Sequence, residues 1–327
     1  MPTSPFQYIF PGIIAAQGIH AAVKFNIPEL LASGPKSAAE LAADCGAHAP
    51  ALERLLRALA SIEMFQRMPD GRYRNTALTD VLRADHPQSL RSIAMYLPSQ
   101  FLWLPVGELS ESIRTGEAAF ERVSGQRFFD FFADHPEEAT IFNRVMTQEI
   151  AWTTPAILKA YDFSRFKHLV DVGGNQGEFL RDILAATPKL QGVLFDQPQV
   201  VAGAEKYLKG EVAARATILC GSFFDGVPEG CDVYLLKRIL HDWKDEDALK
   251  ILGNVRRAMD ANGTLLLLES LVDSAVNPAG LGDLMMLVIG GRERTEADFR
   301  SLLGSAGFKL SRMIPAGPYQ LIECHAA

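Results

Sequence analysis

Asp171-Val-Gly-Gly-Asn-Gln-Gly177 lies between a short apolar run, His168–Val172, and an amphipathic segment, Glu178–Ala186. This order predicts a buried strand that turns directly into a helix. Glycines in such a turn permit positive φ values and let a ligand approach the backbone closely. The turn alone is a weak signal for a bound cofactor, because nicotinamide and flavin enzymes share the pattern and a purely structural tight turn also fits it.

The rest of the second half of the chain has the same alternation of short apolar runs and amphipathic segments. Further strands are predicted at Gly192–Phe195, Thr217–Cys220, Val233–Leu236 and Leu265–Leu268, and further helices at Val200–Leu208, Glu246–Met259 and Glu296–Leu303. Strands that alternate with helices predict an α/β fold, a Rossmann-like doubly wound sheet with helices on both faces. Two final runs, about Lys309–Ile314 and Gln320–Glu323, flank Gly317-Pro and predict an antiparallel hairpin.

The first hundred residues predict small helices and a hairpin instead. Ser37-Ala-Ala-Glu40 matches a capping box that opens one helix, and a second helix from about Ala49 carries leucines at three- and four-residue spacing. Met68-Pro-Asp-Gly-Arg-Tyr-Arg follows as a predicted hairpin turn. Helix, helix and hairpin together indicate a mainly helical winged-helix domain at residues 1–100. Residues 101–327 then hold connecting helices and a catalytic domain whose Rossmann-like core spans about 163–327.

Charge bears on whether the winged helix binds DNA. The formal net charge is −7 and no run of five or more basic residues occurs, so we expect no nucleic acid partner. The second predicted helix exposes Glu53, Arg54 and Arg57, a mixed set that favours packing or dimerisation over DNA binding. A ligand-sensing DNA-binding protein stays open as the less favoured alternative.

Composition also bears on membranes, metals and location. The apolar stretch 6–32 is interrupted by Pro11, Lys24 and Glu29, among others, so we expect an amphipathic helix and no membrane anchor. The four cysteines are scattered, without a C-x-x-C pair or histidines at zinc-ligand spacing. We therefore expect no metal site and a reducing, cytoplasmic setting.

A carboxylate follows the second predicted strand. Asp196, in Leu194-Phe-Asp-Gln-Pro198, lies 19 residues beyond Gly177. An acidic residue in this position accepts hydrogen bonds from ribose hydroxyls, whereas the alternative is a helix cap before Pro198. Together with the glycine turn, Asp196 indicates an adenosine site.

The fourth predicted strand ends in Lys237-Arg-Ile-Leu-His-Asp-Trp-Lys-Asp-Glu246. The carboxyl ends of parallel strands face the ligand crevice. A histidine with an ordinary pKa of about 6.5 can take a proton from a phenol of pKa about 10 as the oxygen attacks an electrophile, and a sulfonium methyl is such an electrophile. His241 is therefore the candidate general base, against the alternative of a residue that only packs beside Trp243.

Two glutamates are candidate partners of this histidine. Glu269 ends the next predicted strand and lies on the same rim of the sheet, where its carboxylate could orient the imidazole. Glu293, in Gly290-Gly-Arg-Glu-Arg-Thr295, could do the same from the other side. A helix cap or a surface ion pair is the alternative for either glutamate.

Taken in order, these motifs resemble the plant caffeate and flavonoid type of O-methyltransferase and its bacterial relatives in natural-product biosynthesis. The resemblance covers nearly the whole chain, through the D-V-G-G-x-x-G turn, the acid after the second strand and the K-x-x-x-H-D-W block. It implies a class I methyltransferase (EC 2.1.1) that uses S-adenosylmethionine, releases S-adenosylhomocysteine and needs no metal. It also implies that the winged helix is a dimerisation module, and the apolar N-terminal helix fits a homodimer.

The resemblance implies a role for each site residue. The cofactor contacts are Asp171, Gly173, Gly174, Asp196, Gln197, Ser222, Phe223 and Lys237; the catalytic residues are His241, the base, with Glu269 and Glu293 beside it. For a small hydroxylated, aromatic acceptor, Met286 resembles a family methionine that packs against the ring, and Asp242 is a further expected contact. Independently of the resemblance, Phe142, Asn143 and Met146 are pocket candidates because connecting helices often wall the substrate crevice. Plain core packing is the alternative for these three and for Met286.

One motif departs from the family pattern. The family commonly has G-D-[MF]-F before the fourth strand, whereas this chain has Gly221-Ser-Phe-Phe224. The carboxylate that would contact adenine is therefore missing. Ser222 can still donate a hydrogen bond and Phe223 can still pack on the adenine, so we expect rearranged adenine contacts.

Methyl transfer to nitrogen or carbon would use the same cofactor site, so an N- or C-methyltransferase is the main alternative to the O-methyltransferase. A nicotinamide oxidoreductase is a further alternative, because it shares the glycine turn.

Overall fold

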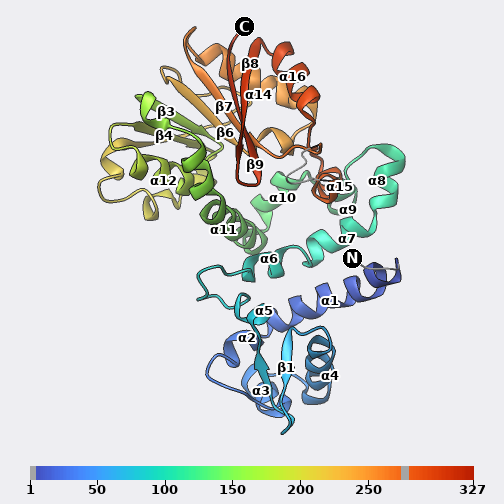
Figure 1. Ribbon diagram of the computed structural model, residues 1–327. Coiled ribbons are helices and arrows are strands. Elements are labelled where there is room, and N and C mark those ends of the chain that lie inside the picture. The colour runs from blue at the N-terminus through green and yellow to red at the C-terminus, as the bar shows by residue number, and fades with distance from the viewer. Residues whose placement is uncertain (1–4, 274–279) are drawn as a thin grey trace. The chain divides into compact units, whose positions relative to one another are not determined.

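The computed structural model describes residues 5–273 and 280–327, which form two compact units (Figure 1). The first unit comprises residues 1–104 and 132–148, and the second comprises 105–131 and 149–327. No helix in the described part of the chain is long and apolar enough to cross a membrane.

The first unit contains the predicted helix, helix and hairpin. Its elements begin with α1 (Phe6–Lys24), α2 (Ile27–Leu30), α3 (Ala38–Cys45) and α4 (Ala49–Ala60), followed by the antiparallel pair β1 (Phe65–Arg67) and β2 (Tyr73–Asn75), then α5 (Ala77–Asp80) and α6 (Arg91–Tyr96). The predicted capping box is present, because the Glu40 N–H donates to Ser37 Oγ and the Ser37 N–H donates to the Glu40 carboxylate. Buried leucines of α4 pack with Phe65 and Tyr73 in the core of this unit.

The connecting segment is helical, as the sequence predicted. It comprises α7 (Gln100–Gly107), α8 (Leu109–Thr115), α9 (Ala119–Ser124), α10 (Phe128–Asp134) and the long α11 (Pro136–Ala160). α8 and α9 belong to the second unit, whereas α7, α10 and α11 contribute residues to both units.

The second unit contains a seven-stranded sheet with the order β5-β4-β3-β6-β7-β9-β8. The strands are β3 (His168–Val172), β4 (Gln191–Asp196), β5 (Ala216–Cys220), β6 (Val233–Lys237), β7 (Thr264–Glu269), β8 (Phe308–Ala316) and β9 (Tyr319–Ala326). The first five pair in parallel, and β9 pairs antiparallel with both β7 and β8. The predicted parallel sheet and terminal hairpin are therefore confirmed.

Helices cover both faces of this sheet because successive strand residues point to opposite faces. Val170, Tyr234 and Leu267 face the layer that contains α14 (Asp245–Ala258) and α16 (Glu296–Ser305). Leu169 and Leu235 face the layer that contains α11 and α12 (Glu178–Ala186). Two buried apolar faces on one sheet explain why the strands read as continuous apolar runs.

The order of the strands reverses between β3 and β6. From β3 the chain proceeds to β4 and β5 on one side, and then crosses to β6 and β7 on the other. Ligands of open α/β sheets bind at such a switch point, outside the carboxyl ends of the strands. The glycine turn after β3 and the histidine segment after β6 both lie there.

One predicted helix was wrong. In place of a helix at Val200–Leu208, the structure has a single α-helical turn, α13 (Pro198–Val201), followed by a 3₁₀ turn at Ala204–Lys206. Gly203 stands between the two turns, and glycine disfavours a continuous helix by about 1 kcal/mol relative to alanine.

Candidate active site

The glycine turn after β3 is packed tightly. Gly173 has φ 71°, and its N–H donates to the Phe195 carbonyl at 2.8 Å. A Cβ at Gly173 would lie 2.4 Å from Ile239 Cδ1, and one at Gly174 would lie 2.6 Å from Asp171 Oδ2. Only glycine fits either position without movement of its neighbours, so the close packing of this turn requires glycine at both.

Asp171 lies beneath this turn and is almost fully buried. Its Oδ2 atom has no hydrogen-bond partner among the described residues. Burial raises the pKa of Asp171 to about 7, while the positive charge of Lys237 acts in the opposite direction. A buried carboxylate oxygen without a partner fits a ligand that carries a cationic or hydrogen-bond donor group.

Asp196 ends β4 and is held by two backbone groups. Its carboxylate accepts the N–H of Asn175 at 2.9 Å and the N–H of Gln197 at 2.7 Å. Burial raises the pKa of Asp196 to about 6, and these two hydrogen bonds limit the rise. The carboxylate is half-buried, and Gln197 is exposed.

Ser222 and Phe223 follow β5, on the same edge of the sheet. Ser222 Oγ accepts the Phe224 N–H at 3.2 Å, so it caps its own turn. The Phe223 ring packs against Phe224 and Trp243, with centroids 5.0 and 5.9 Å away. Asn254 Nδ2 donates a hydrogen bond to the Phe223 carbonyl oxygen at 2.6 Å. The ring is therefore fixed beside the glycine turn, where Phe223 Cε1 would lie 3.7 Å from a Cβ at Gly173.

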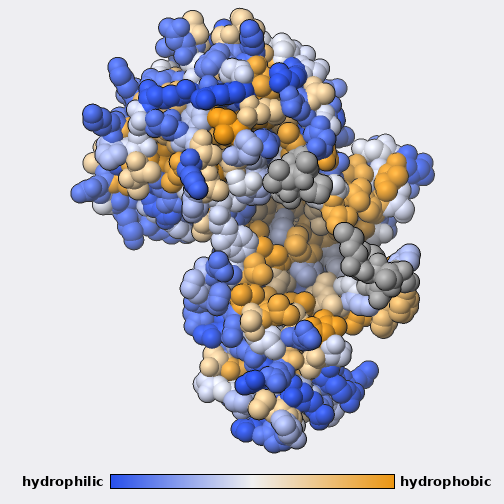
Figure 2. Space-filling model, viewed as in Figure 1, coloured by the Kyte–Doolittle hydropathy of each residue, from blue (hydrophilic) through white to orange (hydrophobic). Residues whose placement is uncertain are grey.

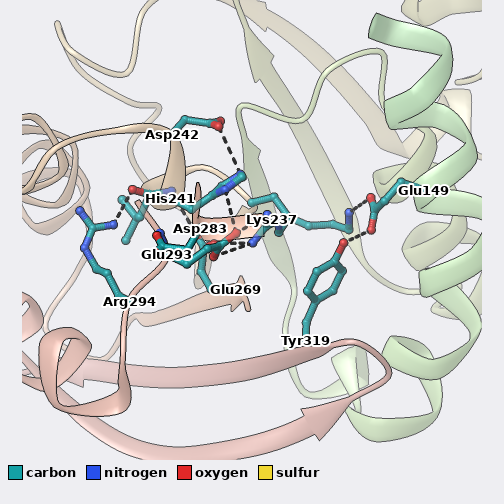
Figure 3. Close-up of polar contacts among 11 residues, drawn as sticks. Glu149, Lys237, His241, Asp242, Glu269, Asp283, Glu293, Arg294 and Tyr319 are labelled. Carbon is teal, nitrogen blue, oxygen red and sulfur yellow. Dashed lines mark hydrogen bonds and ion pairs between the residues drawn. The ribbon is translucent and has the colours of Figure 1, made fainter. Parts of the chain in front are cut away.

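Lys237 ends β6 and is nearly buried. Its Nζ atom pairs with Glu149 of α11, and the other oxygen of Glu149 accepts the hydroxyl hydrogen of Tyr319 (Figure 3). Burial lowers the pKa of Lys237, although the Glu149 carboxylate opposes that effect. Lys237 thus stands at the carboxyl end of β6 as part of a three-residue polar cluster.

His241 lies in the 3₁₀ turn after β6 and is buried. Its Nδ1 atom is 3.4 Å from Glu293 Oε1, and its Nε2 atom is 3.3 Å from Asp242 Oδ1 (Figure 3). Burial and the charge of Arg238 lower the pKa of His241 to about 4. Burial also raises the pKa of Asp242 well above its ordinary value. The imidazole is therefore neutral near pH 7 and able to accept a proton.

Glu269 is fully buried on the same rim, but it does not orient the imidazole directly. Its Oε1 accepts the Leu240 N–H at 2.9 Å, and its Oε2 lies 3.6 Å from Arg238. No ion pair within 4.0 Å joins it to His241 in the described chain. Burial raises the pKa of Glu269 to about 7. Glu269 therefore acts on the backbone before His241, and Glu293 is the glutamate beside the ring.

The segment before α16 fixes the position of the histidine turn. The Arg292 N–H donates to the His241 carbonyl at 2.7 Å, and a Cβ at Gly291 would lie 2.2 Å from that carbonyl oxygen. Arg294, almost fully buried, donates to the Leu240 carbonyl at 2.6 Å and to Asp245 at 2.8 Å. The two loops are therefore joined through backbone atoms as well as side chains.

A cavity of about 550 Å³ opens beside this turn within the second unit. Asp242 and Trp243 line it, together with Phe129 of α10 and Ile289 of α15 (Gly280–Ile289). Phe129 stacks on Trp243 with centroids 5.7 Å apart. The wall beside Asp242 therefore combines aromatic rings with charged side chains such as Arg127 and Lys244.

The other predicted acceptor contacts lie on two helices. Met286 is half-buried on α15, and its carbonyl accepts the N–H groups of Gly290 and Gly291 at 2.8 Å each. Phe142, Asn143 and Met146 are half-buried on α11, in the part assigned to the first unit. Phe142 there stacks on Phe132, with centroids 4.9 Å apart.

Sequence reasoning missed several residues of this site. Arg238 and Arg294 each adjoin a residue that the motifs did single out, so their position next to Lys237 and Glu293 was a usable signal. Glu149 and Tyr319 come from distant parts of the chain, and no local pattern marks either of them.

Two family models match the chain in order. Residues 7–85 match the O-methyltransferase dimerisation domain, and residues 106–309 match the O-methyltransferase domain. The glycine turn therefore belongs to a methyltransferase and not to a nicotinamide oxidoreductase.

Individual relatives agree with this result. The chain is 36% identical over 325 residues to the mitomycin biosynthesis 6-O-methyltransferase of Streptomyces lavendulae, covering 98% of this chain and 93% of the relative. It is 37% identical over 313 residues to the 8-amino-8-demethylriboflavin N,N-dimethyltransferase of Streptomyces davaonensis, covering 94% and 90%.

A solved structure is similar over nearly the same length. It is the O-methyltransferase NcsB1 from neocarzinostatin biosynthesis, in complex with S-adenosylmethionine and 2-hydroxy-5-methyl naphthoic acid. The TM-score is 0.87 at 31% identity, and the match covers 96% of each chain. With both domain models in order and relatives matched along almost its entire length, the chain belongs to the O-methyltransferase family and is a methyltransferase.

Proposed function

We propose that this protein transfers a methyl group from S-adenosylmethionine to an aromatic hydroxyl of a small natural product, with His241 as the general base. The observation that carries this proposal is the buried imidazole at the switch point of the sheet, with Glu293 beside Nδ1 and Asp242 beside Nε2. A base in this place can serve a hydroxyl that enters from the cavity beside Asp242.

The residues at the proposed cofactor edge, which are Asp171, the glycine turn, Asp196 and Phe223, fit S-adenosylmethionine. The unpartnered Asp171 oxygen suits the ammonium group of the amino-acid part, and the Asp196 carboxylate can accept the ribose hydroxyls. Phe223 offers a flat apolar surface for the adenine. Gly173 and Gly174 allow the turn between these groups to pack directly on Ile239 and Asp171. We propose Lys237, Ser222 and Gln197 as outer contacts, since each already has a polar partner or is exposed.

When bound, S-adenosylmethionine supplies a methyl group on a positively charged sulfur. Bound there, it would supply this methyl group to the acceptor oxygen and leave as a neutral thioether. His241 Nε2 would accept the hydroxyl proton of the acceptor. Glu293 stabilises the imidazolium at Nδ1. The base contributes on the order of 10² to 10⁴ in rate, and alignment of the two reactants supplies much of the remainder.

Nitrogen is the second candidate acceptor atom. The relative from Streptomyces davaonensis is an N,N-dimethyltransferase at 37% identity, similar to the identity with the mitomycin enzyme. An amine that is already neutral needs less help from a base than a phenol does. Dependence of turnover on His241 therefore separates the two acceptors.

We also propose that the protein is a homodimer that acts in the cytoplasm. The dimerisation domain covers α1, and large apolar side chains of this helix are exposed, among them Ile9, Phe10, Ile13 and Ile14 (Figure 2). A second copy that covered this face would bury it. Sedimentation at working concentration tests the dimer, and a monomer would contradict it.

The first experiment measures cofactor binding and methyl transfer separately. S-adenosylhomocysteine is titrated calorimetrically into the wild type, His241→Ala and Asp196→Ala, and transfer to 2-hydroxy-5-methyl naphthoic acid and other phenols is followed by mass spectrometry. We expect Asp196→Ala to weaken binding roughly tenfold or more, since it loses charge-assisted hydrogen bonds. His241→Ala should bind normally but lose on the order of 10² or more in kcat.

Two exposed residues provide matched controls. His168→Ala and Asp225→Ala remove the same side-chain types from exposed positions of the same unit, and both variants should behave as wild type. Absence of S-adenosylhomocysteine binding to the wild type would contradict the cofactor assignment. Full turnover of a phenol by His241→Ala would contradict the base.

A further inference from the structure

Arg238 has an unusual backbone conformation directly after β6. Its φ is 56°, in the left-handed region that favours glycine, and its N–H donates to the Leu268 carbonyl at 2.9 Å. Such a conformation has an energetic cost in a residue with a side chain. A glycine here would avoid that cost, so the arginine side chain must contribute something that glycine cannot.

The guanidinium of Arg238 donates two hydrogen bonds to the Glu293 carboxylate. Nη2 lies 2.7 Å from Oε1, and Nη1 lies 3.1 Å from Oε2. The same Oε1 atom is 3.4 Å from His241 Nδ1. One carboxylate oxygen is therefore shared between a permanent cation and the proposed base.

Other charged and titratable groups surround this shared carboxylate. Glu269 of β7 lies 3.6 Å from the guanidinium, and the ring of Tyr319 from β9 lies 5.5 Å from it. Asp242 lies on the far side of the imidazole, and Asp283 of α15 accepts the Glu293 N–H at 2.8 Å. Other nearby cations among the described residues are Lys237, which pairs with Glu149, Arg294, which pairs with Asp245, and Arg292, which pairs with Asp245 and Asp298.

Arg238 thus determines which group beside Glu293 carries the positive charge. Burial alone would raise the pKa of Glu293, but contacts with His241 and Arg238 bring it down to about 2. Without Arg238, the imidazolium would be the cation in contact with Glu293, and the carboxylate would favour that protonated form. With Arg238 in place, the carboxylate is already compensated and the imidazole can stay neutral.

We propose that Arg238 is a positioning residue of the methyl transfer, which holds Glu293 ionised and oriented toward His241 Nδ1 and so keeps the imidazole neutral with Nε2 ready to accept a proton. This proposal rests on the proposed role of His241 as the base. In the resting enzyme, Arg238 neutralises the charge of the Glu293 carboxylate. The His241 imidazolium neutralises that charge only during methyl transfer.

The test follows the imidazole itself and needs no acceptor. Protein labelled with ¹³C in its histidines is titrated from pH 4 to 9 by NMR, and the His241 signal is assigned by its loss in His241→Ala. In the wild type His241 should remain neutral over most of this range, because its pKa is about 4. In Arg238→Gln the titration should move up by at least one pH unit, a tenfold gain in proton affinity. Arg238→Lys keeps the charge and should titrate close to the wild type.

A nearby arginine gives the matched control. Arg292→Gln removes a guanidinium from the same rim, but one that is partly exposed and paired with Asp245 and Asp298. It should leave the His241 titration unchanged. An unchanged titration in Arg238→Gln, or an equal shift in Arg292→Gln, would overturn the proposal.

Glu293→Gln keeps the proposal testable if Arg238→Gln does not fold. Arg238 then faces the imidazole without the intervening carboxylate, so His241 should hold its proton even less tightly than in the wild type. A rise in its pKa in this variant would also overturn the proposal.

A kinetic comparison links the imidazole to transfer. For a phenol that the enzyme methylates, kcat/KM falls on the acid side of its pH profile. The pH of this fall should be higher in Arg238→Gln than in the wild type and unchanged in Arg238→Lys. Binding of S-adenosylhomocysteine should be equal in all three proteins. Because the NMR titration needs no turnover, the two proposals can fail separately. If His241 is not the base, turnover does not depend on it. If the Arg238 proposal is wrong, the pKa of His241 does not shift in Arg238→Gln.

Discussion

The proposed cofactor edge of the sheet and the proposed catalytic turn after β6 hold their carboxylates in different ways. At the cofactor edge, Asp171 Oδ2 has no partner among the described residues, and Asp196 is held by backbone N–H groups alone. At the catalytic turn, Glu293 is bound by Arg238 and lies beside His241. The first region thus offers its charge to a ligand, whereas the second compensates its charge within the chain.

This difference separates two tasks. A site that must bind and release a cofactor keeps hydrogen-bonding capacity unused until the ligand arrives. A base must have the correct protonation state before the acceptor enters, so its neighbours fix that state in advance. Substitutions at the cofactor edge should therefore affect binding, and substitutions at the catalytic turn should affect turnover.

The strongest test of this separation is Gly291→Ala. The added Cβ would lie 2.2 Å from the His241 carbonyl oxygen and 3.0 Å from the Asp242 Cα, both backbone atoms that can yield only if the histidine turn moves. A displacement of about 1 Å near the reacting groups lowers rates on the order of 10²-fold. We expect kcat to fall by that factor or more while S-adenosylhomocysteine binds with wild-type affinity in calorimetry.

Gly304→Ala is the control for this variant. Gly304 lies on α16, and no atom lies within 4 Å of the Cβ that alanine would add there. Its kcat should match the wild type. If Gly291→Ala lost cofactor binding to the same extent as turnover, the two regions would not be separable.

Gly174→Ala is the corresponding change at the cofactor edge. Its Cβ would lie 2.6 Å from both Asp171 Oδ2 and Leu194 Cδ1, so the turn or the carboxylate must shift. Overpacking of this kind typically costs about 1 to 3 kcal/mol. We expect the Kd for S-adenosylhomocysteine to rise roughly tenfold to hundredfold, with a smaller effect on kcat at saturating cofactor.

Gly226→Ala provides its control, because no atom lies within 4 Å of a Cβ there and its φ is not positive. That variant should bind the cofactor product normally. A large fall in kcat with unchanged binding in Gly174→Ala would reverse the assignment of tasks.

The cofactor edge was more predictable from sequence than the catalytic turn. The glycine turn and Asp196 are read from local patterns, because a strand end, a tight turn and a helix start are all specified within a few residues. The parallel strands were equally local, since each is an apolar run buried on both faces. The broken helix at Val200–Leu208 was missed because its apolar spacing outweighed the single Gly203 in the prediction.

The catalytic turn depends on contacts between residues far apart in the chain. Arg238 and Glu293 are 55 positions apart, and Lys237 and Glu149 are 88 apart. Because the carboxyl ends of parallel strands share one edge of the sheet, the sequence placed Glu269 on the correct rim. It could not show that the Glu269 carboxylate would accept the Leu240 N–H and not contact the imidazole. Side-chain partners of this kind follow from the tertiary structure, and no spacing in the sequence encodes them.

The smallest predicted effect is a pH dependence that belongs to the cofactor edge alone. The pKa of Asp196 is raised to about 6, so below that pH the carboxyl group gains a proton and loses capacity to accept the ribose hydroxyls. Affinity for S-adenosylhomocysteine should therefore rise between pH 5 and 7, by about tenfold if Asp196 must be ionised. Calorimetry at three pH values measures this rise.

Substitutions in the two regions should then separate. Asp196→Asn cannot titrate, so it should bind more weakly at pH 7 and show a much flatter pH dependence, with any residual slope due to Asp171, whose pKa is about 7. Glu293→Gln at the catalytic turn should keep the full wild-type slope, because the pKa of Glu293 is about 2 and the group does not titrate in this range. A flatter pH dependence of binding in Glu293→Gln would mean that the charge of Glu293 affects cofactor affinity. The proposal that the two regions act separately would then be wrong.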